Sequence, residues 1–85
     1  MTAVLRAGRV LAVNRVGTPT ADGVTPVWCA IFTNTTRLQR TLWVPSDRVD
    51  AFRGSVRFLW RLEGGEGRVV AVGHDDCELV LTAAT

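Results

Sequence analysis

One stretch of the sequence, residues 56–62 (Val-Arg-Phe-Leu-Trp-Arg-Leu), alternates between two sets of side chains. Its even positions hold Val56, Phe58, Trp60 and Leu62, and its odd positions hold Arg57, Leu59 and Arg61. Successive side chains of a β-strand point to opposite faces of the sheet, so this period of two predicts a half-buried strand. We expect the apolar set to face the core and the two arginines to lie on the outer face.

The length of the chain limits it to one domain, which we place at residues 1–85. A chain of this size buries about 60–65% of its unfolded surface, so its core is thin and association with a second copy would stabilise it. No apolar run approaches the roughly 18–20 residues of a membrane span. Residues 1–9 contain no sustained apolar segment and do not resemble a signal peptide, so we expect a cytoplasmic protein.

All ten basic residues are arginine. Two explanations are open, and the first does not exclude the second: a coding bias toward arginine, or a use of planar guanidinium groups that bind phosphates through two hydrogen bonds or stack on bases. The charge is also uneven, because residues 1–61 hold nine arginines and three acids, whereas residues 62–85 hold one arginine and five acids. Two outcomes are open: one basic face on a nearly neutral protein, or charges that pair when the two parts of the chain interleave.

The two cysteines, Cys29 and Cys77, lie in apolar runs that resemble strands. Without a secretion signal both are expected to be reduced and buried, and a bridge between them is the alternative. The sequence has no C-x-x-C pair and no second Cys/His cluster, so we expect no metal site.

Apolar and β-branched runs, separated by Gly, Pro, Asn and Asp, predict six strands. They cover residues 4–16, 24–33, 40–45, 55–63, 68–73 and 77–82. Loops or turns are expected at residues 17–23, 33–39, 64–67 and 74–76. The first strand bends near Gly8, where a missing side chain permits a bulge or a close backbone approach. Ser46 is a good N-cap and Gly54 suits the position after a helix, so we expect one or two helical turns between them. Val49 and Phe52 are spaced i, i+3 in this segment and could close one end of the barrel.

This order of elements predicts an all-β protein. The expected fold is a small five- to six-stranded barrel, OB-like, with one short helical turn between strands three and four. An SH3-like barrel is the alternative architecture, because it also carries a helical turn among short strands. Closure into a barrel removes exposed sheet edges.

The second strand is apolar on both faces. Val27, Cys29 and Ile31 line one face, and Trp28, Ala30 and Phe32 line the other. A small open sheet normally has one polar face. We therefore expect a second copy, a ligand or another part of the chain to cover the outer face of this strand.

Residues 40–62 resemble the middle of bacterial-type single-stranded DNA-binding OB domains, in which a Thr-x-Trp strand precedes a helix and Gly-Ser opens an alternating strand. The matching residues are Thr41, Trp43, Gly54, Ser55, Val56, Phe58, Trp60 and Leu62. Trp60 stands where the family has a glycine, the helix is shorter, and the likeness covers about a quarter of the chain. The filamentous-phage single-stranded DNA-binding proteins, which are compact dimers, have a comparable length and a projecting loop between early strands. The resemblance implies an OB barrel that binds single-stranded DNA.

Aromatic and arginine side chains are interleaved along the middle of the chain. Single-strand binders use aromatic faces to stack on bases, at about 1–3 kcal/mol per base, and cations to follow the backbone. The candidate nucleic-acid-binding residues are Trp28, Phe32, Arg37, Arg40, Trp43, Arg57 and Arg61. Trp28 and Trp43 are the expected exposed platform. Arg9 and Arg15 share a parity on the first strand and can also reach a phosphate path.

Two other interpretations of these residues are open. The tryptophans and phenylalanines can simply form the core of a small domain, with the arginines solvated. A patch of aromatic residues and arginine also fits a protein interface, where both are enriched.

Residue patterns typical of catalysis are missing from the sequence. His74, Asp75 and Asp76 are expected to form a turn with a single histidine, and there is no Gly-x-Ser-x-Gly motif. Residues 64–67 carry an acid and precede no expected helix, unlike a phosphate loop. We expect no enzymatic activity, no cofactor, no small-molecule substrate and no membrane partner.

Taken together, these patterns predict a single-stranded nucleic-acid-binding protein that acts as a homo-oligomer, most simply a dimer. Binding is expected on the outer faces of strands two to four. The alternative is a non-catalytic protein-interaction or assembly module of SH3-like or OB-like fold.

Overall fold

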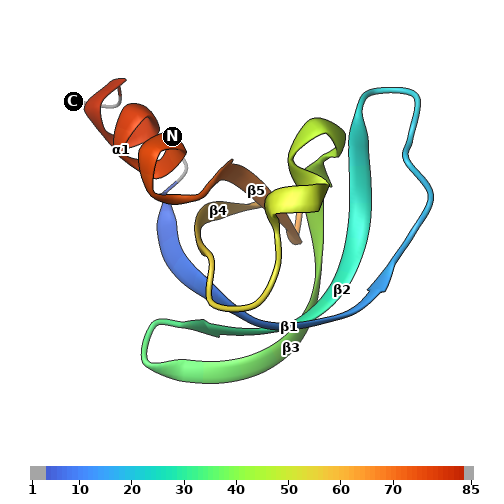
Figure 1. Ribbon diagram of the computed structural model, residues 1–85, viewed down its shortest axis with the longest axis horizontal. Helices are drawn as coiled ribbons and strands as arrows, with labels where there is room; N and C mark the ends of the chain where they lie inside the picture. The colour runs from blue at the N-terminus through green and yellow to red at the C-terminus, as the bar shows by residue number, and fades with distance from the viewer. Residues whose placement is uncertain (1–3, 84–85) are drawn as a thin grey trace.

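The computed structural model describes residues 4–83, which form a closed five-stranded barrel with one helix packed on its outside (Figure 1). Its elements are β1 (Arg6–Val16), β2 (Val24–Thr33), β3 (Thr36–Pro45), the 3-10 helix η1 (Ser46–Ala51), β4 (Arg57–Glu63), β5 (Glu66–Val72) and α1 (His74–Ala83). The order around the barrel is β1-β2-β3-β5-β4, and β4 pairs back onto β1. Neighbouring strands are antiparallel except β3 and β5, which are parallel. The predicted small OB-like barrel, with one short helical turn between strands three and four, is confirmed.

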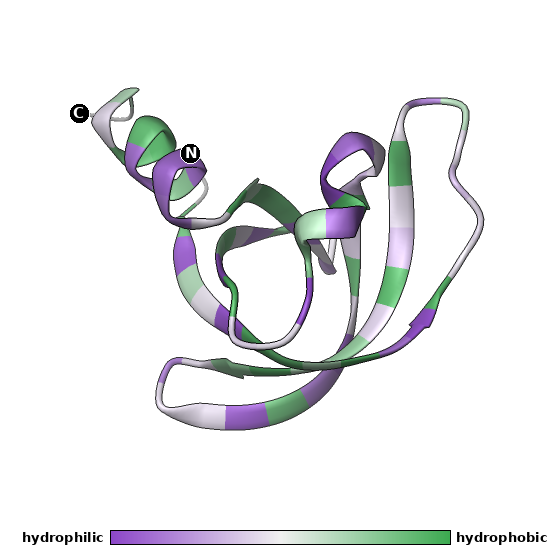
Figure 2. Cartoon of the chain, in the orientation of Figure 1, coloured by the Kyte–Doolittle hydropathy of each residue, from purple (hydrophilic) through white to green (hydrophobic). Residues whose placement is uncertain are grey.

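The alternation that predicts the strands also decides which side chains fill the barrel. Phe58 and Trp60 are buried, as expected, and the Trp60 indole Nε1–H donates to Thr33 Oγ1 at 3.2 Å. Leu62, near the end of β4, is 40% exposed and lies outside the core, contrary to expectation. Figure 2 shows β2 in green and pale colours, in keeping with a strand that carries no charged residue. The buried residues of this strand are Thr25, Val27, Cys29, Ile31 and Thr33.

The segment after β3 packs against the core through two side chains. The Phe52 ring centroid lies 5.1 Å from that of Phe58 in an edge-to-face arrangement, and Val49 contacts the same core. The expected packing of Val49 and Phe52 is therefore confirmed. The expected cap is not: η1 has Pro45 at its N-cap, and the Ser46 hydroxyl instead lies 2.7 Å from Thr25 Oγ1.

Gly8 lies where β1 changes partners. Residues 6–9 pair with β4, and residues 8–16 pair with β2. A Cβ atom on Gly8 would lie 2.6 Å from Cζ of Phe58, which is closer than real Cβ atoms come to other atoms. The predicted close approach at Gly8 is confirmed, because the missing side chain makes room for the buried phenylalanine ring.

The C-terminal element is a helix, α1, and the prediction of a turn at 74–76 and a strand at 77–82 was wrong. Two acids in its first turn, Asp75 and Asp76, favour a helix start. Cys77 and Val80, spaced i, i+3, pack outside the barrel against Leu59 and Ala71. Of the alternating apolar residues Cys77, Leu79 and Leu81, Cys77 is buried, whereas Leu79 is 72% exposed and Leu81 48%.

Two hairpin turns are tighter than expected. Asn34 and Thr35 have positive φ angles of 51° and 57°, so a two-residue turn suffices and β3 begins at Thr36 rather than at residue 40. The segment 33–39 is therefore mostly strand. Gly64 and Gly65, also with positive φ, make the turn between β4 and β5.

Both cysteines are free and buried, which excludes a bridge between them. Cys29 points into the barrel and Cys77 lies under α1, outside it. The expectation of buried cysteines is confirmed.

None of the helices within residues 4–83 is long and apolar enough to cross a membrane. Residues 1–3, which belong to the segment in which no signal peptide is expected, lie outside the described part of the chain.

Candidate nucleic-acid interface

A row of basic and aromatic side chains crosses the outside of four adjacent strands. Arg57 of β4 pairs with Arg9 of β1, Arg9 pairs with Phe32 of β2, and Phe32 pairs with Arg37 of β3. Directly paired residues share a face of the sheet, so the four side chains stand side by side. With about 4.8 Å between strands, the row spans about 14 Å. All four side chains are exposed, Phe32 by 42%. We call these four residues the arginine row.

A second row lies further along β1 and β2. Arg15 pairs with Trp28, and its Cζ lies 4.8 Å from the Trp28 ring centroid in a cation–π contact. Trp28 is 37% exposed. A Cβ atom on Gly17 would lie 3.0 Å from the Trp28 ring, so the glycine allows the ring to lie close to the backbone of the β1–β2 loop.

Trp43 continues the aromatic surface onto β3. It pairs with Pro26 of β2, two residues from Trp28, so the two tryptophans are diagonal neighbours on one face. Trp43 is half-buried and also pairs with Arg68 of β5. Between the rows, Asn14 Nδ2 donates to Gln39 Oε1 at 2.9 Å and links β1 to β3 across β2.

Charge separates cleanly on this surface. Strands β1, β2 and β3 carry five arginines and no acidic residue. The acids of residues 4–83 lie in the β1–β2 loop, η1, the β4–β5 hairpin and α1. Within those residues, Arg9, Arg37 and Arg57 have no ion-pair partner, whereas Arg48 and Arg61 do. Both charge outcomes left open by the sequence therefore occur: a basic face on β1–β3, and paired charges elsewhere.

The structure brings together five of the seven candidate residues. Trp28, Phe32, Arg37 and Trp43 share the outer face of β2 and β3. Arg57 joins them from the far side of β1, because β4 neighbours β1 in the barrel and not β3. The outer faces of β2, β3 and β4 therefore do not form one continuous surface by themselves. β1 lies between β2 and β4, and its outer face joins the two parts.

The other two candidates lie elsewhere. Arg40 pairs with Cys29, so it is on the inward-facing side of β3; its Cζ lies 5.3 Å from the Trp60 ring centroid, and its Nη2 donates to the Gly65 carbonyl at 3.4 Å. Arg61 faces outward on β4, but its Nε contacts Glu63 Oε2 at 3.1 Å. Both arginines are engaged within the protein. Arg61 pairs across the sheet with Arg68, the neighbour of Trp43, so it lies two strands from the aromatic face.

Two residues of the surface, Arg9 and Arg15, were not among the seven, although their shared parity pointed to the outer face. Two register shifts interrupt β1, between Val10 and Ala12 and between Val13 and Arg15. Each shift adds one residue to β1, so the two shifts together leave Arg9 and Arg15 on the same face of the sheet.

A groove lies between α1 and the barrel, at the Arg57 end of the arginine row. Its volume is about 400 Å³. Arg9, Phe32 and Arg57 line the barrel side, and Glu78 and Leu81 line the helix side. The wrong strand prediction for 77–82 concealed this groove, because side chains of α1 form one of its walls.

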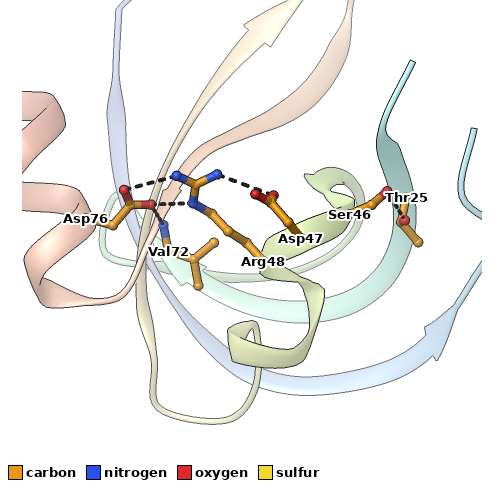
Figure 3. A network of polar contacts seen from close by, with 6 residues as sticks. All are labelled: Thr25, Ser46, Asp47, Arg48, Val72 and Asp76. Carbon is orange, nitrogen blue, oxygen red and sulfur yellow. Dashed lines mark hydrogen bonds and ion pairs between the residues drawn. The ribbon is translucent and has the colours of Figure 1, made fainter. Parts of the chain in front are cut away.

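The acidic motif at the start of α1 holds the helix in place. Figure 3 shows the bidentate contact of Arg48 of η1 with Asp76, in which Nε donates to Oδ2 at 2.8 Å and Nη2 donates to Oδ1 at 3.4 Å. These hydrogen bonds raise the pKa of Arg48 above its ordinary value. Asp76 Oδ2 also accepts the Val72 N–H at 2.9 Å. His74 Nε2 lies 3.5 Å from Glu78 Oε1, and residues 4–83 contain no group of three metal-binding side chains placed to hold an ion.

The chain was compared with known proteins at the level of family, sequence and three-dimensional structure. No protein family, no curated protein and no solved structure matches it.

Proposed function

We propose that this protein binds single-stranded nucleic acid on the outer face of β1, β2 and β3, extended by Arg57 of β4. The observation that carries the proposal is the arginine row: three exposed arginines, which have no ion-pair partner among residues 4–83, flank an exposed phenylalanine. Uncompensated arginines beside an exposed aromatic ring suit a ligand that is both anionic and planar.

The two kinds of side chain have separate roles. Arg9, Arg37 and Arg57 receive phosphates, and each contact releases counterions from the strand. Phe32, Trp28 and Trp43 offer ring faces to unpaired bases, and the Arg15 guanidinium stacked on Trp28 offers a second planar surface. A duplex hides its base faces, so the aromatic part of this surface favours single strands.

Tryptophan fluorescence with oligo-dT at low salt tests the proposal. Trp60 is buried, so Trp28 and Trp43 are the tryptophans that a stacked base can quench. We expect quenching by oligo-dT and weaker binding of a duplex. Trp28→Ala should weaken binding about tenfold or more, because it removes one stacked base.

A matched pair of variants separates the surface from the overall charge. Arg37→Gln and Arg61→Gln remove the same charge, but only Arg37 lies in the arginine row. We expect Arg37→Gln to weaken binding several-fold and Arg61→Gln to leave it nearly unchanged. The absence of quenching at low salt, or equal losses in the two variants, would overturn the proposal.

A second candidate function uses the same surface to contact protein. Trp28, Phe32 and Leu11 are apolar and between 37% and 42% exposed on adjacent strands, so a second copy of the chain can bury them. This candidate predicts a dimer by light scattering that Phe32→Glu converts to a monomer. A monomeric wild-type protein that still binds oligo-dT would rule it out and leave the first candidate standing.

A further inference from the structure

The groove beside α1 and the arginine row meet at Arg9 and Arg57. These two residues are direct partners across β1 and β4, and both line the groove. Like charges directly opposite each other destabilise a sheet. An anion between the two guanidinium groups would offset this repulsion. A phosphate suits this position, because each guanidinium can donate two parallel hydrogen bonds to its oxygens.

The helix blocks the row at this end. In Figure 1, α1 and the turn between β2 and β3 lie on the left, with the start of β1 between them. A strand that follows the row from Arg37 through Phe32 to Arg57 meets the wall formed by Glu78 and Leu81 of α1. The groove, at about 400 Å³, is within the size range of pockets that take small ligands.

We propose that this groove holds the terminal nucleotide of the bound strand. Its terminal phosphate lies between Arg9 and Arg57, and its base lies against Phe32 and Leu81. This inference rests on the proposed function, and it adds that the protein recognises a phosphorylated strand end rather than only a stretch of backbone. A terminal phosphate carries more negative charge than an internal one, which matches two unpaired arginines better than one internal phosphate does.

One acid lines the groove and acts against this ligand. Glu78 is paired with His74 at 3.5 Å, which partly offsets its charge. Removing the carboxylate should therefore strengthen, rather than weaken, the binding of a phosphorylated end.

The test compares unlabelled oligo-dT of one length with a 5′-phosphate, with a 3′-phosphate, or with hydroxyl groups at both ends, by tryptophan quenching or calorimetry. We expect one of the two phosphorylated oligonucleotides to bind about tenfold more tightly than the hydroxyl-ended one, as one added charge-assisted contact predicts. Which of the two gains affinity identifies the polarity of the strand. Arg57→Gln should remove the difference, Arg61→Gln should keep it, and Glu78→Gln should increase it about two- to threefold.

Leu81→Ala provides a second variant, which removes the apolar side chain proposed to contact the terminal base and changes no charge. Calorimetry should show a smaller gain from the terminal phosphate in this variant than in the wild type. Equal affinity of all three oligonucleotides, or an equal loss for all three in Arg57→Gln, overturns the end-binding inference and leaves the proposed function intact. Failure of every oligonucleotide to bind overturns both.

Discussion

At the scale of single residues, Trp60 shows how two arginines pack on a buried ring. Here the indole is 3% exposed, and the Cζ atoms of Arg6 and Arg40 lie 5.5 Å and 5.3 Å from its ring centroid. Space for the ring comes from β5, where a Cβ atom on Gly67 would lie 3.3 Å from it and would clash with Leu42. Arg6, which is exposed, and Arg40, which is half-buried, thus pack on the ring of a core residue.

Glycine at position 8 should be required for the same kind of reason. Gly8→Ala places a methyl group 2.6 Å from the Phe58 ring, which is held in the core, and should lower the free energy of unfolding by about 1–3 kcal/mol. Gly54→Ala is the matched control, because its Cβ would lie 3.7 Å from the Leu11 carbonyl, an ordinary contact. Urea denaturation measures both changes, and equal stability of the two variants would contradict the prediction.

Cys29 should make the stability depend on pH in the alkaline range. Burial raises the pKa of its thiol from 9.0 to about 11. Between these values the unfolded chain loses a proton that the folded protein keeps, so the free energy of unfolding falls as pH rises, by about 2–3 kcal/mol in all. Cys77, whose pKa is also raised by burial, changes stability in the same direction.

This effect can be isolated because the chain contains no tyrosine and no lysine. Cysteines are therefore the only side chains with ordinary pKa values in this window. Urea denaturation at several pH values between about 8 and 11 should show a shallower fall in Cys29→Ala than in the wild type. An unchanged slope in this variant would show that Cys29 does not titrate as expected.

At the scale of elements, α1 determines whether the groove exists. It contacts β4 and β5 through Cys77 and Val80, a small apolar cluster, and it is tied to η1 by Arg48 and Asp76. This ion pair joins residues 28 positions apart in the sequence. A short apolar stripe and a two-point ion pair therefore both contribute to holding the helix.

A double-mutant cycle should detect this contact. With Arg48→Met and Asp76→Asn, we expect a coupling energy of about 1 kcal/mol. The Asp76 side chain is only 23% exposed, and both of its carboxylate oxygens accept hydrogen bonds from the Arg48 guanidinium. The pair Arg61 and Glu63, exposed by 42% and 52%, is the control and should couple by less than about 0.5 kcal/mol. Amide hydrogen exchange in α1 should quicken in Asp76→Asn, and equal coupling in the two pairs would contradict this role of the helix contact.

At the scale of the whole molecule, closure of the barrel concentrates charge. The chain has a net charge of only +2, yet the strands β1–β3 bear arginines alone. The acids lie elsewhere, on the loop, the hairpin and the two helices. A nearly neutral protein can therefore attract a polyanion to one face.

The salt dependence of binding should report the size of that face. If Arg9, Arg37 and Arg57 each meet one phosphate of hydroxyl-ended oligo-dT, the logarithm of the association constant should fall with the logarithm of salt concentration with a slope of about −2. Arg37→Gln should make the slope shallower by about 0.7. A slope near zero in the wild type would exclude phosphate contacts on this surface.

The sequence predicted the inward and outward faces of the strands well. Phe58 and Trp60 are in the core, and Trp28 and Phe32 are outside, because the pleat of a strand alternates its side chains whatever its neighbours are. It failed at residues 74–82, where Cys77, Leu79 and Leu81 alternate while Cys77 and Val80 have helical spacing. Such a short segment fits both periods, and contact with Leu59 and Ala71 decided in favour of the helix.

The candidate site was predictable only to the extent that it depends on strand faces. The sequence by itself determined that Trp28, Phe32 and Arg57 lie on outer faces, since this follows from local alternation. Only the tertiary structure decided which of them meet: β4 closes onto β1, which places Arg57 beside Arg9, whereas Arg40 lies against Trp60 and Arg61 is paired with Glu63. Strand order in a barrel arises from contacts between segments far apart in the chain, and no local pattern encodes it.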